Sequence, residues 1–134
     1  MAALAAIDKA MSNPAAPSRP PLEAAGLSDK RILDAIGDVR TLRDSQWYRA
    51  GKSQIRSLTP TAVELSGAQP KVTLRSCVDF SATVLHFQKD HKVVPVSASS
   101  NKRVTFSAEL RYAARSSASP KMWFLTDEKA SGTC

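Results

Sequence analysis

The sequence predicts an α+β domain in which N-terminal helices pack on a strongly curved, cone-like antiparallel β-sheet. In the first third of the chain, apolar residues recur at steps of three and four, the period of an amphipathic helix; from Ser53 onward they recur at every second position, the period of a strand. Helices followed by hairpin-connected strands favour a sheet that is covered on one face. With 134 residues we expect one domain over residues 1–134, divided into a helical part (1–51) and an antiparallel sheet (52–134).

Two helices are predicted in the first part. Residues 2–11 form a short helix that ends before Pro14, because a proline disfavours helical geometry in the residue before it. Residues 13–21 contain four prolines and predict a connector. The stronger helix begins at Ser28, whose hydroxyl suits an N-cap, and is closed by Gly51. Its apolar stripe is expected to consist of Ile32, Leu33, Ile36, Val39, Leu42 and Trp47.

The rest of the chain predicts a run of strands. Pro60 marks the first of them as an edge or bulged strand, because proline cannot donate a ladder hydrogen bond. Strict alternation of apolar and polar residues indicates that two long strands each have one apolar face. The expected strands are residues 55–65, 71–80, 82–88 and 92–96 as a hairpin around the turn 89–91, 104–112, and 121–128 after a serine-rich loop.

Two cysteines are the most informative residues of the chain. Cys77 lies inside an alternating strand and Cys134 ends a polar tail that would fray unless something held it. We expect a Cys77–Cys134 disulfide, with two free thiols in a cytosolic protein as the alternative. A disulfide would place the protein in an oxidising compartment. Because residues 1–11 lack the pattern of a secretory signal, we expect the export signal or anchor to lie upstream of this chain.

A net charge of +7 favours anionic partners, such as an anionic envelope surface. The basic residues are scattered and few aromatic residues accompany them, which disfavours nucleic-acid binding. No metal or cofactor is expected, because the two cysteines, His86 and His91 lack the short spacing of metal ligands. Both histidines are interpreted as surface or turn residues.

No residue is assigned a catalytic role. Asp79 is the best-placed carboxylate for a general base, but it is interpreted as a structural hydrogen-bond acceptor or ion-pair partner. The pair formed by Trp47 and Tyr48 is expected to pack against the sheet rather than stack on a ligand. The candidate cleft residues are Trp47, Tyr48, Asp79, Tyr112 and Trp123.

Several of these features in order resemble a known family. The segment Cys77-Val-Asp-Phe-Ser81, two further strands, Trp123 in the last strand and the terminal Cys134 resemble envelope-anchored actinobacterial domains of the nuclear transport factor 2-like superfamily, of lipoprotein or membrane-anchored type. The similarity covers about residues 50–134. It implies a cone of curved antiparallel sheet around helices with a cleft between them. Since this fold carries many functions, it does not by itself assign one.

Three functions remain open. The preferred one is a non-enzymatic extracytoplasmic accessory domain of a bacterial cell-envelope protein, which binds a protein partner or an apolar ligand by its sheet face or cleft. The second is a periplasmic-type domain of a conjugation or type IV secretion channel, where such domains form homo-oligomers. The third is a small-molecule isomerase or hydratase, which would need acidic and basic groups inside the cone.

Overall fold

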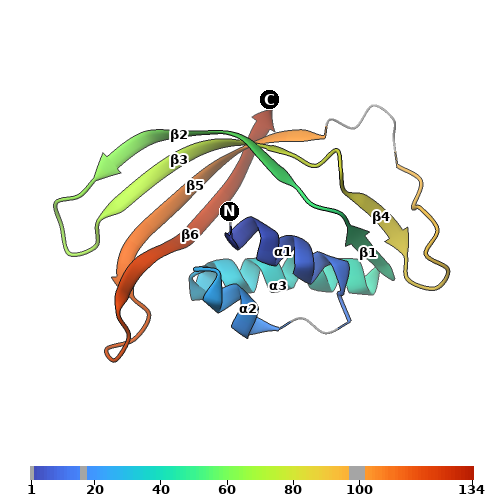
Figure 1. Ribbon diagram of the computed structural model, residues 1–134, viewed down its shortest axis with the longest axis horizontal. Helices are drawn as coiled ribbons and strands as arrows, with labels where there is room; N and C mark the ends of the chain where they lie inside the picture. Colours follow the sequence, from blue (N-terminus) through green and yellow to red (C-terminus); the bar gives the residue numbers. More distant parts are fainter. Residues whose placement is uncertain (1, 16–17, 97–101) are drawn as a thin grey trace.

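The computed structural model describes residues 2–15, 18–96 and 102–134, and its fold is α+β as predicted. A layer of helices lies beneath an arched antiparallel sheet (Figure 1). The helices are α1 (Ala2–Ser12), α2 (Arg19–Ala24) and α3 (Asp29–Asp44). The strands are β1 (Trp47–Ala50), β2 (Gln54–Glu64), β3 (Lys71–Asp79), β4 (Val84–Phe87), β5 (Arg103–Ala114) and β6 (Lys121–Thr133).

The helix starts follow the local signals in the sequence. The Ser28 side chain caps α3 by accepting a hydrogen bond from the Arg31 backbone N–H, as predicted. The predicted connector was wrong in part, because α2 begins inside it, at Arg19. Its Pro20 lies in the first turn of α2, where a missing backbone N–H costs no helical hydrogen bond. Prolines that suggest a connector are therefore also compatible with the start of a short helix.

The apolar stripe of α3 is narrower than predicted. Ile32 is fully buried and Val39 nearly so, but Leu33 is 62% exposed. The neighbouring Arg31 is buried instead, and its Nη2 donates to the Glu128 carboxylate of β6 at 2.9 Å. Each step along a helix turns the side chain by about 100°, so a buried stripe of Arg31, Ile32, Ala35 and Val39 leaves Leu33 on the solvent side. The prediction that Leu33 belongs to the buried stripe was wrong.

The helical part also ends earlier than residue 51. Helix α3 stops at Asp44, and Gln46 takes a left-handed backbone conformation with φ 61°. Trp47 then begins β1, so its place on the helical stripe was a wrong prediction. Gly51 does not close the helix. Its φ is 103°, and a Cβ there would lie 2.0 Å from the Ala82 carbonyl oxygen, so glycine is required by a close approach of two chain segments.

The larger sheet has the strand order β2-β3-β5-β6, antiparallel throughout. Strand β2 forms one edge, with register shifts on both sides of Leu58 and Pro60 within the bulged strand, as predicted. At the opposite edge, Leu125 of β6 exchanges backbone hydrogen bonds with Gly26 and Ser28. That edge is therefore covered at its middle by the segment that joins α2 to α3.

A second, two-stranded ribbon pairs β1 with β4. The predicted hairpin between residues 82–88 and 92–96 is present in part. His86 bridges Val93, the Phe87 backbone N–H donates to Lys92 and the Val94 N–H donates to Leu85, but residues 92–96 do not form a strand. Strand β4 takes its main partner from β1 instead, with Tyr48 opposite His86. The turn itself lies at the predicted place, with His91 at φ 59°.

The main core cluster lies within the helical layer and is formed by side chains of α1, α2, α3 and the connection between α2 and α3. Its fully buried side chains are Leu22, Leu27, Ile32 and Val39. Alternate residues of β3, including Ser76 and Val78, face α1 as the period of two predicted. The outer halves of the strands extend past the helices (Figure 1).

Candidate functional site

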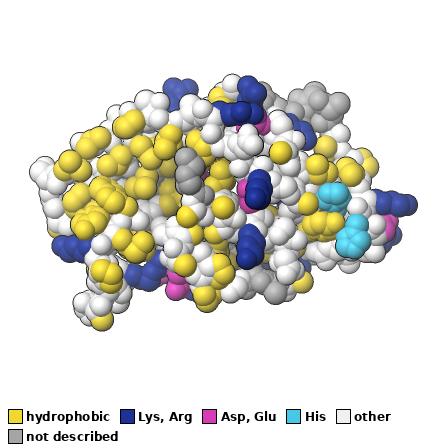
Figure 2. Space-filling model, in the orientation of Figure 1, with side chains coloured by type: hydrophobic (Ala, Val, Ile, Leu, Met, Phe, Trp, Pro, Cys, Tyr) yellow, Lys and Arg dark blue, Asp and Glu magenta, His cyan; other side chains and the backbone are white. Residues whose placement is uncertain are grey.

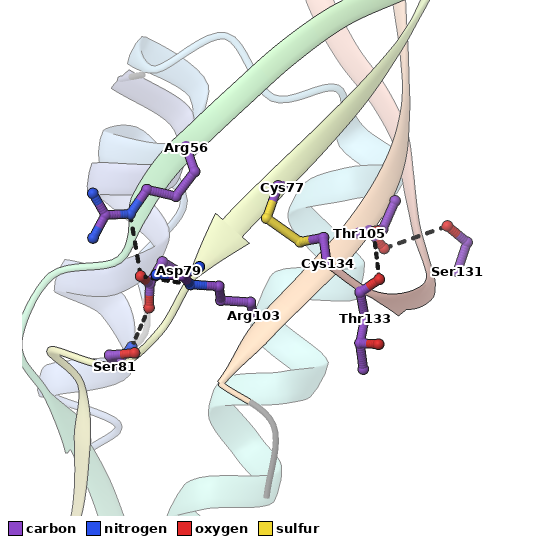
Figure 3. The surroundings of a disulfide bond; sticks show 9 residues. All are labelled: Arg56, Cys77, Asp79, Ser81, Arg103, Thr105, Ser131, Thr133 and Cys134. Carbon is purple, nitrogen blue, oxygen red and sulfur yellow. Dashed lines mark hydrogen bonds and ion pairs between the residues drawn. A yellow bond between two sulfur atoms is a disulfide. The ribbon is translucent and has the colours of Figure 1, made fainter.

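The disulfide predicted from the sequence is present. Cys77 and Cys134 are joined by an S–S bond of 2.05 Å, with their Cα atoms 6.0 Å apart (Figure 3). Thr105 of β5 lies in register with Cys77 on one side and Gly132 on the other, so the bond spans β5 and links β3 to the end of β6. The Thr105 hydroxyl also donates to the Thr133 carbonyl at 3.3 Å. The polar tail is thereby held on the sheet.

Asp79 lies beside this disulfide in a cluster of polar contacts (Figure 3). Its side chain is only 4% exposed and accepts hydrogen bonds from the Ser81 backbone N–H at 2.9 Å and from Arg56 Nε at 3.1 Å. Arg103 Nε donates to the same carboxylate oxygen as Arg56, at 3.3 Å. Hydrogen bonds from Ser81, together with those from the two arginines, hold the pKa of Asp79 well below its ordinary value. A carboxylate held in this way is a poor proton acceptor, and its contacts are those of a structural ion pair.

This cluster predicts a pH-dependent stability. Because the pKa of Asp79 is lower in the folded chain than in the unfolded chain, its charge stabilises the fold fully above the ordinary aspartate pKa of about 3.9. This stabilisation is lost progressively as the pH falls from that value toward the lower pKa of the folded chain. We expect Asp79→Asn to lower the urea midpoint at pH 7 and to lower it less at pH 3. Asp38→Asn is the control, since Asp38 forms no ion pair within the described residues. An equal loss for Asp79→Asn at both pH values would contradict the assignment.

The five candidate cleft residues do not meet in one place. Tyr112 and Trp123 are cross-strand neighbours with ring centroids 5.5 Å apart, near the outer ends of β5 and β6. Trp47 and Tyr48 lie in the β1–β4 ribbon, where Tyr48 stacks on His86 at 5.1 Å. Asp79 lies between these two regions, beside the disulfide. Tyr48 therefore packs against its own sheet.

An apolar surface surrounds the Tyr112–Trp123 pair. The cross-strand register places Val63 opposite Val72, Val72 opposite Leu110, and Tyr112 opposite Trp123, all on the concave side of the sheet. Figure 2 shows hydrophobic side chains gathered at this end of the molecule. We name this surface the outer sheet face, which consists of Leu58, Val63, Val72, Leu74, Leu110, Tyr112 and Trp123.

The exposure of this face follows from element lengths. Strand β5 has 12 residues and spans about 40 Å at roughly 3.4 Å per residue, whereas α1 has 11 residues and spans about 16 Å at roughly 1.5 Å per residue. The helices thus cover only part of each strand, leaving Val63 56% and Trp123 41% exposed. Sequence reasoning selected Tyr112 and Trp123 but missed Val63, Val72, Leu74 and Leu110. The sequence did contain a signal for them: the apolar faces of the predicted long strands extend farther than the predicted helices could cover.

A second apolar hollow lies at the other end of the molecule, beside the β1–β4 ribbon. We name it the β4 cleft; it has a volume of about 770 Å³. It was missed because residues 92–96 were predicted as a strand arm rather than as a wall of a cleft. Its lining residues are Met11, Asp38, Thr41, Leu42, Arg49, Phe80, Thr83, Val84, Leu85, Val93, Val94, Val96 and Lys102.

The parts of the chain that the structure describes contain no group of three or more His, Cys, Asp or Glu side chains placed to hold a metal ion. No helix within those parts is both long enough and apolar enough to cross a membrane.

The chain is thus a disulfide-linked α+β domain with two apolar surfaces, the outer sheet face and the β4 cleft. No protein-family model matches the chain, and no curated protein matches it. Among solved structures it is similar to the intermembrane space region of the chloroplast protein ARC6, with 11% sequence identity and a TM-score of 0.49, over 96% of this chain and 91% of that one. A likeness of this degree assigns neither family nor function.

Proposed function

We propose that the chain is a non-enzymatic accessory domain of a bacterial envelope protein, located outside the cytosol, which binds an apolar segment of a partner protein on its outer sheet face. The observation that carries the proposal is the uncovered apolar half of the concave sheet. Apolar patches of this kind on a soluble domain commonly mark binding surfaces.

The covered half of the same sheet indicates what the open half accepts. Leu74 and Leu110 face Leu4 and Ile7 of α1 across a small hollow between that helix and the sheet. An amphipathic helix from the partner would continue this helical layer and cover the Tyr112–Trp123 pair, which the domain's own helices do not reach. Tyrosine and tryptophan at such a position contribute strongly to binding energy.

The surroundings of Asp79 favour binding over catalysis. An isomerase or hydratase needs a carboxylate that can accept a proton near neutral pH. Asp79 is held ionised by two arginines and a backbone N–H, and its hydrogen bonds within the described residues involve neither Tyr48 nor Tyr112. A structural role accounts for all its contacts.

The location outside the cytosol and the family are parts of the same proposal. The Cys77–Cys134 disulfide supports an oxidising compartment, because reducing agents in the cytosol keep most thiols free. The curved sheet around helices, together with Cys77-Val-Asp-Phe-Ser81 and Trp123, supports a domain of the nuclear transport factor 2-like superfamily. Because this superfamily carries many functions, membership in it would not identify the partner, which has to be inferred from the binding surface itself.

Photo-crosslinking tests the binding surface. A benzoylphenylalanine in place of Trp123 should give one discrete protein adduct in the native envelope, whereas the same group in place of Leu33, exposed on α3, should give none. Adding Val63→Glu to the Trp123 probe should reduce the adduct by about tenfold or more, because a charge would be buried in the interface. Equal adducts from both probe positions, or an adduct insensitive to Val63→Glu, would contradict the proposal.

A further inference from the structure

The β4 cleft is separate from the outer sheet face and has the properties of a small-molecule site. Its volume of about 770 Å³ falls within the range of about 300–1,000 Å³ that is typical of ligand pockets. Helix residues Met11 and Leu42 form one side, and Val84 and Leu85 of β4 belong to another. None of the lining residues belongs to the outer sheet face.

Most of the lining is aliphatic, and much of it faces solvent. Val93 is 58% exposed, and Val84 and Val96 are exposed as well, whereas Val94 beside them is buried. Exposed β-branched side chains that converge on a hollow gain free energy when an apolar molecule covers them. The shape and lining thus suit a hydrocarbon chain.

Two cationic side chains border the cleft beside Phe80. The Arg49 guanidinium lies 5.4 Å from the centre of the Phe80 ring, and the Lys102 carbonyl accepts a hydrogen bond from the Phe80 backbone N–H. Arg49 Nη2 donates to Asp8 at 2.9 Å and its Nε is buried, but Nη1 has no hydrogen-bond partner within the described residues and the side chain is 21% exposed. Nη1 can therefore donate to an anionic group.

Cationic side chains outnumber carboxylates around the β4 cleft. Lys89, Lys92 and Lys102 form no ion pair within the described residues, although all three lie in the segment that follows β4. Asp90 accepts from the Lys92 backbone N–H, and Asp38 is the acidic residue that lines the cleft. Together with the Arg49–Asp8 pair, these side chains are four cations (Arg49, Lys89, Lys92 and Lys102) against three carboxylates (Asp8, Asp38 and Asp90), a net charge of +1, and Lys102 is the lysine that lines the cleft.

We propose that the β4 cleft binds a single-chain amphiphile, with its hydrocarbon chain along Val84, Val93 and Val96 and a carboxylate head group at Arg49 and Lys102. This ligand class goes beyond the proposed binding of a partner protein and uses other residues. Arginine and lysine at one end of an apolar cleft complement the polarity of such a molecule.

Isothermal titration calorimetry with two probes of equal chain length tests the proposal. Dodecanoate and dodecyltrimethylammonium are compared with the whole chain, each below its critical micelle concentration. Dodecanoate should bind with one molecule per chain and about tenfold more tightly than the cation. Lys102→Gln should weaken dodecanoate binding by about two- to fivefold, and Asp38→Asn should strengthen it by a similar factor, because each changes one exposed charge at the cleft.

Two matched valine substitutions locate the site. Val93→Glu places a charge on the cleft wall and should reduce dodecanoate affinity by about tenfold or more, whereas Val63→Glu on the outer sheet face should leave it unchanged. Both residues are exposed, so neither substitution should prevent folding. No binding, equal affinity for the two probes, or loss with Val63→Glu instead of Val93→Glu would overturn the proposal. Loss of the partner adduct with Val63→Glu and retention of dodecanoate binding would support both proposals independently.

Discussion

Replacing both cysteines, Cys77→Ser with Cys134→Ser, is expected to lower the free energy of unfolding by about 4 kcal/mol. The disulfide joins residues 57 apart in sequence, and a crosslink of that span removes many conformations from the unfolded chain. For a domain of this size, such a loss should lower the midpoint of thermal unfolding by about 10 °C or more.

Urea unfolding followed by tryptophan fluorescence measures this change, with the reduced wild-type chain as a second sample that lacks the bond but keeps both sulfur atoms. The intact mass of the native protein should lie two daltons below that of the reduced protein. If the urea midpoint is unchanged in both samples, the bond would only be holding residues 130–134 against fraying, and the expected global effect would be wrong.

Ile32→Ala is expected to cost about 2–5 kcal/mol of stability, whereas Leu33→Ala should change it by no more than about 0.5 kcal/mol. The two residues are adjacent on α3 and of equal size, but Ile32 is fully buried and Leu33 is 62% exposed. Ile32 belongs to the core cluster with Leu22, Leu27 and Val39, so its truncation would leave a cavity. Leu33 has little packing to lose.

Chemical denaturation of the two variants side by side provides the measurement, with helical content checked by circular dichroism to exclude a change in α3 itself. Alanine is the better helix former in both cases, so propensity cannot explain a difference between them. Equal losses for the two variants would contradict the orientation of α3 on the sheet.

Features encoded by nearby residues were predictable from the sequence. The Ser28 cap, the edge character of β2 around Pro60 and the alternation along β3 and β5 all depend on interactions within a few residues or on a simple period. The Cys77–Cys134 bond was predictable because the cysteines offered a single intramolecular pairing. Each of these predictions was confirmed.

Features that depend on distant partners were not predictable. Trp47 continues the helical spacing of α3, and only its pairing opposite Phe87, forty residues later, identifies it as part of a strand. For the same reason the hairpin of residues 82–88 and 92–96 was only partly right: residues 92–94 do pair with β4, but the sequence does not reveal that the main partner of β4 is β1. Periodicity reports which face of an element is apolar, but not which element covers it.

The candidate site was predictable only in part, for a related reason. Tyr112 and Trp123 were selected as aromatic residues on long strands, and they do lie together. Asp79 and Tyr48 were selected by chemical type. The neighbours of Asp79 are arginines of adjacent strands, and those of Tyr48 are His86 of the paired strand and His91 of the turn after it. Residue type thus indicated which side chains could take part in binding or catalysis. The order of the strands decided which of them share a surface.

The unequal edges of the larger sheet limit how copies of the domain can join. In a fibre that grows by strand addition, every subunit pairs with one neighbour at each of the two edges of its sheet, so both edges must be open. Here Gly26 and Ser28 occupy the middle of the β6 edge, and Pro60 with its flanking bulges interrupts the other. Association through the edges of the larger sheet should therefore stop at a closed pair, which protects the chain against continued polymerisation at high concentration.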